Sequence, residues 1–121
     1  DLHGSTNVNH LRSMKLPIEW EFREQNTIQS NFKIPPVDLL FVDSLHTFDQ
    51  VRDELAIHGE NVKKFILFHD TSLHSQGIRS LDVSDQEGIN RAISEYATAN
   101  GWVERYSVEF GHGLKILVRN Q

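Results

Sequence analysis

The fold of this chain is decided by residues 37–47, VDLLFVDSLHT, in which an apolar run ends in an acid and, three residues later, a histidine. A second run, FILFHDT at residues 65–71, ends in the same two residue types. Each run predicts a buried strand, and ligands of open α/β sheets bind outside the carboxyl ends of the strands. We therefore expect the chemistry of this protein at four side chains: Asp43, His46, His69 and Asp70.

Composition limits the chain to one ordinary domain. With 121 residues, of which 38% are hydrophobic, residues 1–121 suffice for a single core and are too few for two. No cysteine is present, so disulfides and thiolate metal sites are excluded, which fits a reducing cytoplasm. The net charge of −5, without a Lys/Arg cluster, argues against nucleic acid as a partner. No segment has the pattern of a membrane span or a signal peptide, and we expect a cytoplasmic protein without a membrane partner.

The first third of the chain carries three local patterns. Residues 6–14 have apolar side chains at helical spacing, and Ser5 or Thr6 can cap that helix. Residues 18–23 alternate between apolar and polar side chains, which predicts a half-buried strand. Residues 31–36 contain two successive prolines and predict a loop.

Two strand-helix units follow. Residues 37–42 suit a strand that is covered on both faces, as parallel sheets require. The capping box at residues 47–50 opens a helix that Gly59 can end. Its acid-rich face, with Asp49, Asp53 and Glu54, is typical of a solvated surface. Residues 65–68 predict the next strand, and a second capping box at 84–87 opens a helix that Gly101 can end.

The loops and the end of the chain complete the predicted sheet. The polar loop at residues 72–83 is long enough to cover a substrate. Residues 106–118 alternate, turn at Gly111-His112-Gly113 and return, which predicts an antiparallel hairpin. The order of elements indicates an α/β sheet that is parallel in its centre and antiparallel at one edge.

Several segments together resemble the carboxyl half of the class I S-adenosylmethionine-dependent methyltransferases: DLLFVDSLHTFDQV at 38–51, EL at 54–55, HG at 58–59, FHDT at 68–71 and GL at 113–114. The likeness is greatest to the branch that includes cephalosporin hydroxylase-like proteins and the macrolide and sugar O-methyltransferases, and it covers residues 37–119. It implies a Rossmann-like sheet that ends in a hairpin, with S-adenosylmethionine lying across the carboxyl ends of the central strands.

The sequence departs from this family in one respect. No G-x-G-x-x-G loop is present, and the likeness begins at the end of the family's second strand, so the family's first strand and most of its second are not matched. A parallel strand would then be left with unpaired backbone groups, which folded proteins rarely leave exposed. We expect a fragment of a longer domain, a rearranged sheet, or completion by a partner chain through homo-oligomerisation or domain swapping.

The resemblance implies a set of residues for the methyl donor. Asp1 matches the acid that holds the ribose hydroxyls, and a solvated terminal residue is the alternative. Asn26 and Thr27 fall where the family's third strand ends beside the adenine, although Asn26 stands where an acid is usual and a simple turn is the alternative. Asp43 and Ser44 complete the cofactor-binding set.

Asp43 and Asp70 are candidates for a shared cation. Neighbouring strands lie about 4.8 Å apart, so carboxylates at their ends can hold one ion. Two acids with water ligands suit Mg²⁺, and several methyltransferases of the resembling group use such a site to hold the acceptor hydroxyl. His69 is a third candidate ligand, although strand alternation predicts that it and Asp70 point to opposite faces unless the strand has already ended. The alternative is that Asp43 caps the next helix or contacts the cofactor.

His46 is the candidate general base, because imidazoles exchange protons near neutral pH and this one faces the same rim of the sheet. A structural hydrogen-bonding role is the alternative. His112, in the hairpin turn, and His74, in the polar loop, are expected to be surface residues.

The sequence therefore predicts methyl transfer from S-adenosylmethionine to a hydroxyl of a sugar or other small molecule, with Asp43, His46 and Asp70 as the catalytic residues. The first alternative is a non-catalytic methyltransferase-like module that has lost cofactor binding and serves interaction or assembly. A metal-dependent hydrolase built on Asp43, His69 and Asp70 is a weaker alternative, because no nucleophile elbow and no H-E-x-x-H motif occur.

Overall fold

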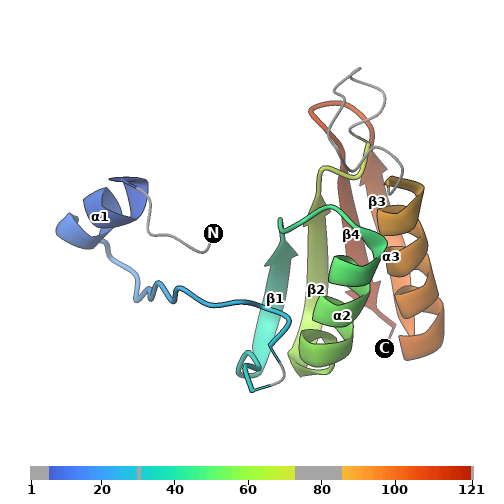
Figure 1. The fold of residues 1–121 in the computed structure, drawn as a ribbon, viewed down its shortest axis with the longest axis horizontal. Helices are drawn as coiled ribbons and strands as arrows, with labels where there is room; N and C mark the ends of the chain where they lie inside the picture. Colours follow the sequence, from blue (N-terminus) through green and yellow to red (C-terminus); the bar gives the residue numbers. More distant parts are fainter. Residues whose placement is uncertain (1–5, 30, 73–85, 121) are drawn as a thin grey trace.

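The structure, a computed structural model, describes residues 6–29, 31–72 and 86–120 (Figure 1). Four strands form one sheet in the order β1-β2-β4-β3. β1 (Val37–Val42) pairs in parallel with β2 (Val62–His69), and β2 pairs antiparallel with β4 (Leu114–Arg119). β3 (Trp102–Val108) pairs antiparallel with β4 at the far edge. The predicted α/β sheet with an antiparallel terminal hairpin is confirmed.

The first crossover helix begins where its capping box predicts. α2 (Phe48–His58) has Thr47 as its N-cap, whose side chain accepts a hydrogen bond from the Gln50 amide. Gly59 ends the helix and opens a short 3₁₀ turn, η1 (Gly59–Asn61), with ordinary helical backbone angles. A Cβ at Gly59 would lie 2.0 Å from the Tyr96 hydroxyl oxygen. Glycine here lets the Tyr96 ring pack closely against the end of α2, and a larger residue would displace that ring.

The second crossover helix, α3 (Gln86–Asn100), ends at Gly101, whose φ of 70° is the left-handed conformation common after helices. The residues expected to cap its start, 84 and 85, lie outside the described residues, as does most of the predicted substrate-covering loop. No described helix is long and apolar enough to cross a membrane.

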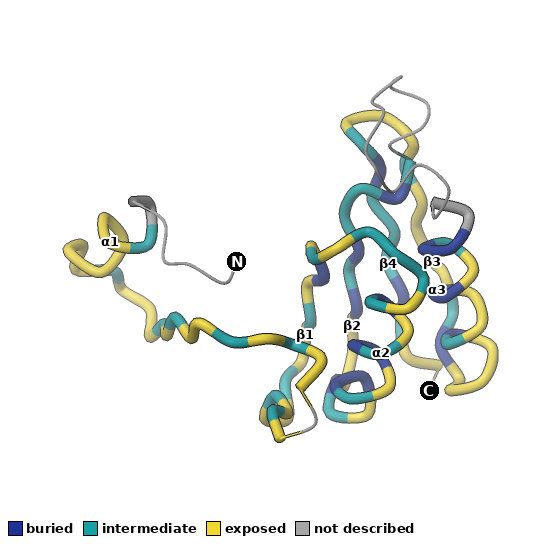
Figure 2. The backbone as a smooth tube through the Cα atoms, viewed as in Figure 1, coloured by how far each residue is buried: buried dark blue, intermediate teal, exposed yellow. Residues whose placement is uncertain are grey.

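Both crossover helices lie on the same side of the sheet (Figure 1). Their apolar faces and the facing strand residues form one core, and Figure 2 shows the dark, buried segments gathered between these layers. Burial of this apolar area is the main stabilising contribution to the domain. The core consists of Val42, Val51, Leu55, Val62, Ile66, Phe68, Ile89, Ala92, Ile93, Ala97, Trp102 and Leu117.

The other face of the sheet is open among the described residues, which corrects the expectation that β1 is covered on both sides. Leu39 is 48% exposed and Phe41 is 51% exposed. They pair in register with Phe65 and Leu67 of β2, so these apolar side chains share one face. An apolar run predicts a hydrophobic strand, but it does not show whether a second layer of helices or strands covers that strand.

Two expectations for the first third of the chain had different outcomes. The predicted helix is present as α1 (Thr6–Ser13), and Figure 1 shows it apart from the sheet at the end of an extended segment. The predicted strand at 18–23 is wrong, because these residues form no strand and Ile18 is largely exposed. Alternation alone does not make a strand, since a strand needs a neighbour to pair its backbone groups.

Candidate functional site

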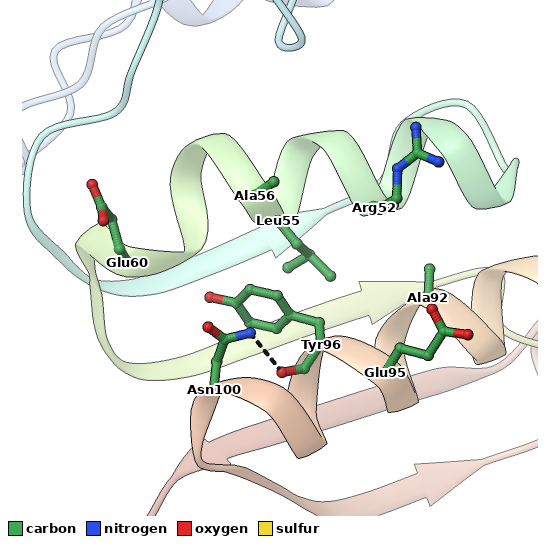
Figure 3. Close-up of a pocket in the computed structure, with 8 residues that line it drawn as sticks. All are labelled: Arg52, Leu55, Ala56, Glu60, Ala92, Glu95, Tyr96 and Asn100. Atoms are coloured by element: carbon green, nitrogen blue, oxygen red, sulfur yellow. Dashed lines mark hydrogen bonds between the residues drawn. The ribbon is translucent and has the colours of Figure 1, made fainter.

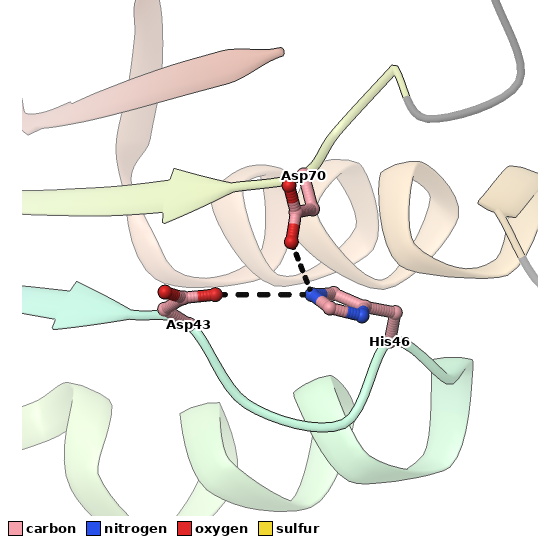
Figure 4. A group of neighbouring side chains, drawn as sticks. All are labelled: Asp43, His46 and Asp70. Carbon is pink, nitrogen blue, oxygen red and sulfur yellow. Dashed lines mark ion pairs between the residues drawn. The ribbon is translucent and has the colours of Figure 1, made fainter. Parts of the chain in front are cut away.

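The carboxyl ends of β1 and β2 bring two predicted acids and a histidine together (Figure 4). The Nε2 atom of His46 lies 3.0 Å from Asp70 Oδ2 and 3.9 Å from Asp43 Oδ1. One potential ligand atom from each of these three residues lies within 4.8 Å of the others. Asp43 is half exposed, whereas the Asp70 side chain is mostly buried. The juxtaposition expected from the two strand ends is therefore present.

Local structure between β1 and α2 aims His46 at these acids. The Thr47 amide donates to the Leu45 carbonyl at 2.9 Å, which closes a tight turn directly after the strand. Thr47 then caps α2, so the residue before it is held at the junction. Figure 4 shows the imidazole pointing back toward the two strand ends. Its contact with Asp70 supports a polar role at the rim rather than a packing role.

His69 also reaches this group. Its Nδ1 atom lies 3.0 Å from Asp70 Oδ1 and 3.7 Å from Asp43 Oδ1. β2 ends at His69, and Asp70 has a φ of 58°, so the alternation of a strand stops between the two residues. The strand has therefore ended before Asp70, which is the case in which the two side chains need not point to opposite faces, and the left-handed backbone at Asp70 turns its carboxylate toward the imidazole.

His112 joins the same group, which sequence reasoning missed by placing it on the surface. Its Nδ1 atom lies 3.4 Å from Asp70 Oδ1, although almost half of the side chain remains exposed. The Ser72 amide donates to the His112 carbonyl at 2.8 Å, so the hairpin turn docks on the segment after β2. The hairpin turn reaches the end of β2 because β4 pairs with β2, and no sequence pattern predicts that strand order. We call Asp43, His46, His69, Asp70 and His112 the His/Asp cluster.

Two observations set this cluster apart from ordinary surface ion pairs. Three of its atoms, His46 Nε2, His69 Nδ1 and Asp70 Oδ1, are buried without a partner in hydrogen-bond geometry among the described residues, although each lies within ion-pair distance of another member. Asp70 and His112 are also the two described non-glycine residues with positive φ. Backbone strain of this kind persists where the surrounding structure imposes it, commonly at functional sites.

The hairpin turn is held against the cluster by a close approach at Gly113. A Cβ there would lie 2.5 Å from the Ser72 amide nitrogen, whereas a Cβ at Gly111 would meet nothing within 4 Å. Both glycines have positive φ. We therefore expect Gly113→Ala to lower the free energy of unfolding by about 1–3 kcal/mol more than Gly111→Ala, measured by denaturant unfolding. Equal effects of the two substitutions would show that the turn is not packed as described.

The residues expected around the adenine have structural hydrogen bonds. The Asn26 side chain accepts from the Ile28 amide at 3.1 Å, as in an Asx turn. The Thr27 hydroxyl donates to Glu54 at 2.5 Å, and the Ser44 hydroxyl donates to the same carboxylate at 2.6 Å. Glu54 is only 4% exposed, so its predicted place on a solvated helix face is wrong. It ties the segment before β1 to the loop after β1.

His58 adds a second tie between α2 and the segment before β1. Its Nε2 atom lies 2.7 Å from the Thr27 carbonyl oxygen, and its Nδ1 atom is 3.3 Å from the Ile34 amide nitrogen, which donates to it. The ring is buried and stacks edge-on with Phe32. The segment is therefore fixed to the helix by side chains of Glu54 and His58.

A cavity of about 740 Å³ lies between this segment and the carboxyl end of β1. Its size is within the range of small-molecule and cofactor sites. Five of the residues predicted for cofactor binding or catalysis line it: Asn26, Thr27, Asp43, Ser44 and His46. Asp1, the candidate ribose ligand, lies outside the described residues.

A second hollow of about 350 Å³ lies between α2 and α3 and contains no member of the His/Asp cluster (Figure 3). Asn100 donates to the Tyr96 carbonyl there at 2.9 Å, and burial raises the pKa of the Tyr96 hydroxyl above its usual value. This hollow is a groove between packed helices, and it is lined by none of the residues predicted for catalysis or cofactor binding.

Comparison with known proteins supports the fold. No protein-family model matches the sequence, and no curated protein matches it. Among solved structures, the chain is similar to that of a candidate caffeoyl-CoA O-methyltransferase from Staphylococcus aureus, with a TM-score of 0.59 and 14% identity. The match covers 79% of this chain and 49% of that protein, so this chain spans about half the length of its structural neighbour. The fold is that of a Rossmann-like methyltransferase.

Proposed function

We propose that this protein functions as an S-adenosylmethionine-dependent O-methyltransferase and that the acceptor is a hydroxyl of a sugar or other small molecule. The observation that carries the proposal is the His/Asp cluster at the carboxyl ends of β1 and β2, beside the 740 Å³ cavity. In open α/β sheets this edge is where ligands bind. The methyltransferase fold favours methyl transfer over other chemistries that the same side chains support.

The reaction requires a hydroxyl oxygen to attack the methyl carbon of the sulfonium. A carbon–oxygen bond forms, the carbon–sulfur bond breaks with its electron pair going to sulfur, and the hydroxyl proton must leave. His46 is the proposed acceptor of that proton, and the imidazolium that results would be stabilised by the Asp70 carboxylate, whose Oδ2 lies 3.0 Å from the ring. Asp70 is thus the orienting acid and His46 the base.

The cavity supplies the second requirement, which is a bound donor at a fixed orientation. Thr27 and Ser44 line the cavity while their hydroxyls are held by Glu54, so their positions are set before any ligand enters. Preorganisation of this kind lowers the ordering cost of binding. Asp43 lines the cavity and faces the cluster, so it links the donor site to the acceptor site.

A divalent cation fits the same edge of the sheet. The unpaired buried atoms of His46, His69 and Asp70 converge there with the carboxylate of Asp43. A cation held by Asp43, His69 and Asp70 would lower the pKa of the acceptor hydroxyl and orient its oxygen. Mg²⁺ is the ion that the sequence resemblance suggests, but it prefers ligand sets made of oxygen. The imidazole nitrogens fit that preference poorly.

Calorimetric titration with S-adenosylhomocysteine tests the donor site. We expect one site per chain, and we expect Ser44→Ala to weaken binding about tenfold or less, since one hydrogen-bonding group contributes roughly 0.5–1.5 kcal/mol. Ser94→Ala on the exposed face of α3 is the matched control and should bind as the parent does. Undetectable binding to the chain would refute a complete donor site in these residues, and the fold would stand.

That outcome would favour the alternative, a non-catalytic methyltransferase-like module. The open apolar face of β1 supports this alternative. Titration therefore separates the two functions directly, because a module that has lost cofactor binding does not respond to S-adenosylhomocysteine.

A further inference from the structure

We propose that two copies of this chain exchange arms, so that the arm of each copy covers the open apolar face of the sheet in the other copy. The arm is residues 6–24, which comprise α1 and the extended segment that follows it. The open face is the side of the sheet that carries no helix among the described residues (Figure 1). This exchange requires neither the donor nor the acceptor of the proposed function.

The open face is apolar across all four strands. Side chains two residues apart on a strand point to the same side of a sheet, so the register of the pairs shows which residues share this face. Tyr106, on the strand farthest from β1, is 54% exposed. Extended apolar surfaces of this kind usually mark an interaction site. In strand order, the face comprises Leu39, Phe41, Phe65, Leu67, Ile116, Val118 and Tyr106.

The arm has exposed apolar side chains of its own. Leu11, Met14 and Ile18 are all exposed, and Figure 2 shows the arm in the colours of exposed and intermediate residues. The Arg12 guanidinium lies 5.4 Å from the centroid of the Phe22 ring, a contact within the arm itself. A helix as short as the eight residues of α1 is marginal in water unless it packs against something. The arm therefore needs an apolar surface, and the open face is one.

The anchor of the arm favours the face of a second copy over the face of the same chain. Thr27 donates to Glu54 of α2, and its carbonyl oxygen lies 2.7 Å from His58 Nε2. The chain thus approaches β1 on the side that the helices cover, and the arm extends away from the sheet (Figure 1). To reach its own open face, the arm would have to reverse direction around the edge of β1. A second copy can bind the arm as it already extends.

Charge favours the same pairing. Residues 6–15 contain Arg12 and Lys15 and no acid, whereas acids outnumber lysines and arginines in residues 37–121. Surfaces of opposite charge associate faster and select the correct partner over others. The basic start of the arm therefore complements the acidic body of a second copy.

The area that the exchange would bury is sufficient for a dimer. Aromatic side chains bury roughly 150–250 Å² each, and about half of the surface of Phe41 and of Tyr106 is exposed. Twofold symmetry uses each contact twice. Together with the apolar side chains of the arm, the two reciprocal contacts would bury roughly 1,200 Å² or more, the lower end of the range for specific interfaces.

Sedimentation equilibrium of the full chain tests the proposal. We expect a species of twice the chain mass of 14.0 kDa. The arm variant, Leu11→Lys with Ile18→Lys, should raise the dissociation constant of the dimer at least about 100-fold, because it removes two buried apolar contacts from each arm. The face variant, Leu39→Glu with Tyr106→Glu, should do the same. A parent chain that is monomeric throughout the measured concentration range would overturn the proposal.

Phe110→Glu is the matched control. Phe110 is 80% exposed and lies in the hairpin turn, outside both the arm and the open face. This variant should form dimers as the parent does, and an equal loss of dimer would show non-specific association of apolar surface. A dimer that survives in the arm variant would show pairing through the strand edges and would refute the exchange.

A mixture of the two variants identifies the contact as one between arm and face. Each variant alone should be monomeric. The mixture should regain dimers, because one contact then joins an unaltered arm to an unaltered face and the other places lysines beside glutamates. A mixture that stays monomeric would refute the exchange.

One measurement requires no substitution. The backbone amides of α1 should exchange hydrogen more slowly as the concentration of the parent chain rises through the dimerisation range, because the helix becomes packed. Exchange rates that do not depend on concentration would refute the proposal. Titration of the same samples with S-adenosylhomocysteine reports separately on the proposed function, so either proposal can fail alone.

Discussion

Asp70→Asn is expected to abolish the function of the His/Asp cluster without unfolding the chain. Among the described residues, Asp70 is the one acid that contacts all three imidazoles, those of His46, His69 and His112. The substitution removes the negative charge that, in the proposed function, orients His46 and contributes to the cation site. Because asparagine tolerates the left-handed conformation that Asp70 adopts, with φ of 58°, the backbone should be retained.

Two measurements check this expectation. Transfer of an isotope-labelled methyl group from S-adenosylmethionine to sugar and phenol hydroxyls should fall by roughly 10²- to 10⁴-fold, the usual contribution of general base catalysis. Affinity for a divalent cation, which needs no acceptor, should fall in parallel. Asp38→Asn is the matched control, because Asp38 pairs with Lys64 on the exposed start of β1. Unchanged methyl transfer in Asp70→Asn would show that this residue is not part of the site.

We expect Glu54→Ala to cause a large decrease in the free energy of unfolding, because this carboxylate is buried. The Glu54 carboxylate accepts hydrogen bonds from Thr27 and Ser44 and from the Gln50 side chain at 2.8 Å. Removing it leaves these donors without their acceptor in a buried place, and each unsatisfied buried group costs about 1–3 kcal/mol. The segment before β1 should become less ordered, and the wall that it forms on one side of the cavity should be disrupted.

Denaturant unfolding should show a decrease of about 3 kcal/mol in the free energy of unfolding for Glu54→Ala. Binding of S-adenosylhomocysteine should weaken as well, because Thr27 and Ser44 line the cavity. Asp53→Ala is the control at the neighbouring position, where the acid is exposed and pairs with Arg52. Such surface pairs contribute about 0–1 kcal/mol. A similar loss for both variants would contradict the central role of Glu54.

The parts of the site that follow from one strand could be predicted from sequence. Asp43 and Asp70 each terminate an apolar run, and parallel strands place their carboxyl ends at one edge, so their meeting was foreseeable. His46 was foreseeable for the same reason, since the cap at Thr47 fixes the helix start just after it. Local patterns thus placed four of the five cluster residues, Asp43, His46, His69 and Asp70, at this edge of the sheet, although they left open whether His69 faces Asp70.

The remaining features depend on tertiary partners that the local sequence does not encode. His112 reaches the cluster only because β4 inserts between β2 and β3, and several strand orders are compatible with the same hairpin. The sequence suggests a surface acid at Glu54, because its three hydrogen-bond donors come from other segments and from the preceding turn of α2. The backbone turn at Asp70, which brings His69 into the cluster, has no signature at a residue other than glycine.

Because Asp43 directly follows β1, the addition of a strand to β1 and the binding of a cation at Asp43 would be thermodynamically linked. β1 is the edge strand of the described sheet, and its apolar side chains Leu39 and Phe41 are open to the solvent. Any polypeptide that adds a strand along this edge would end beside Asp43, a residue of the proposed cation site. If strand addition changes metal affinity by some factor, the ion must change the affinity for that strand by the same factor. Cation concentration would then act as a control on assembly.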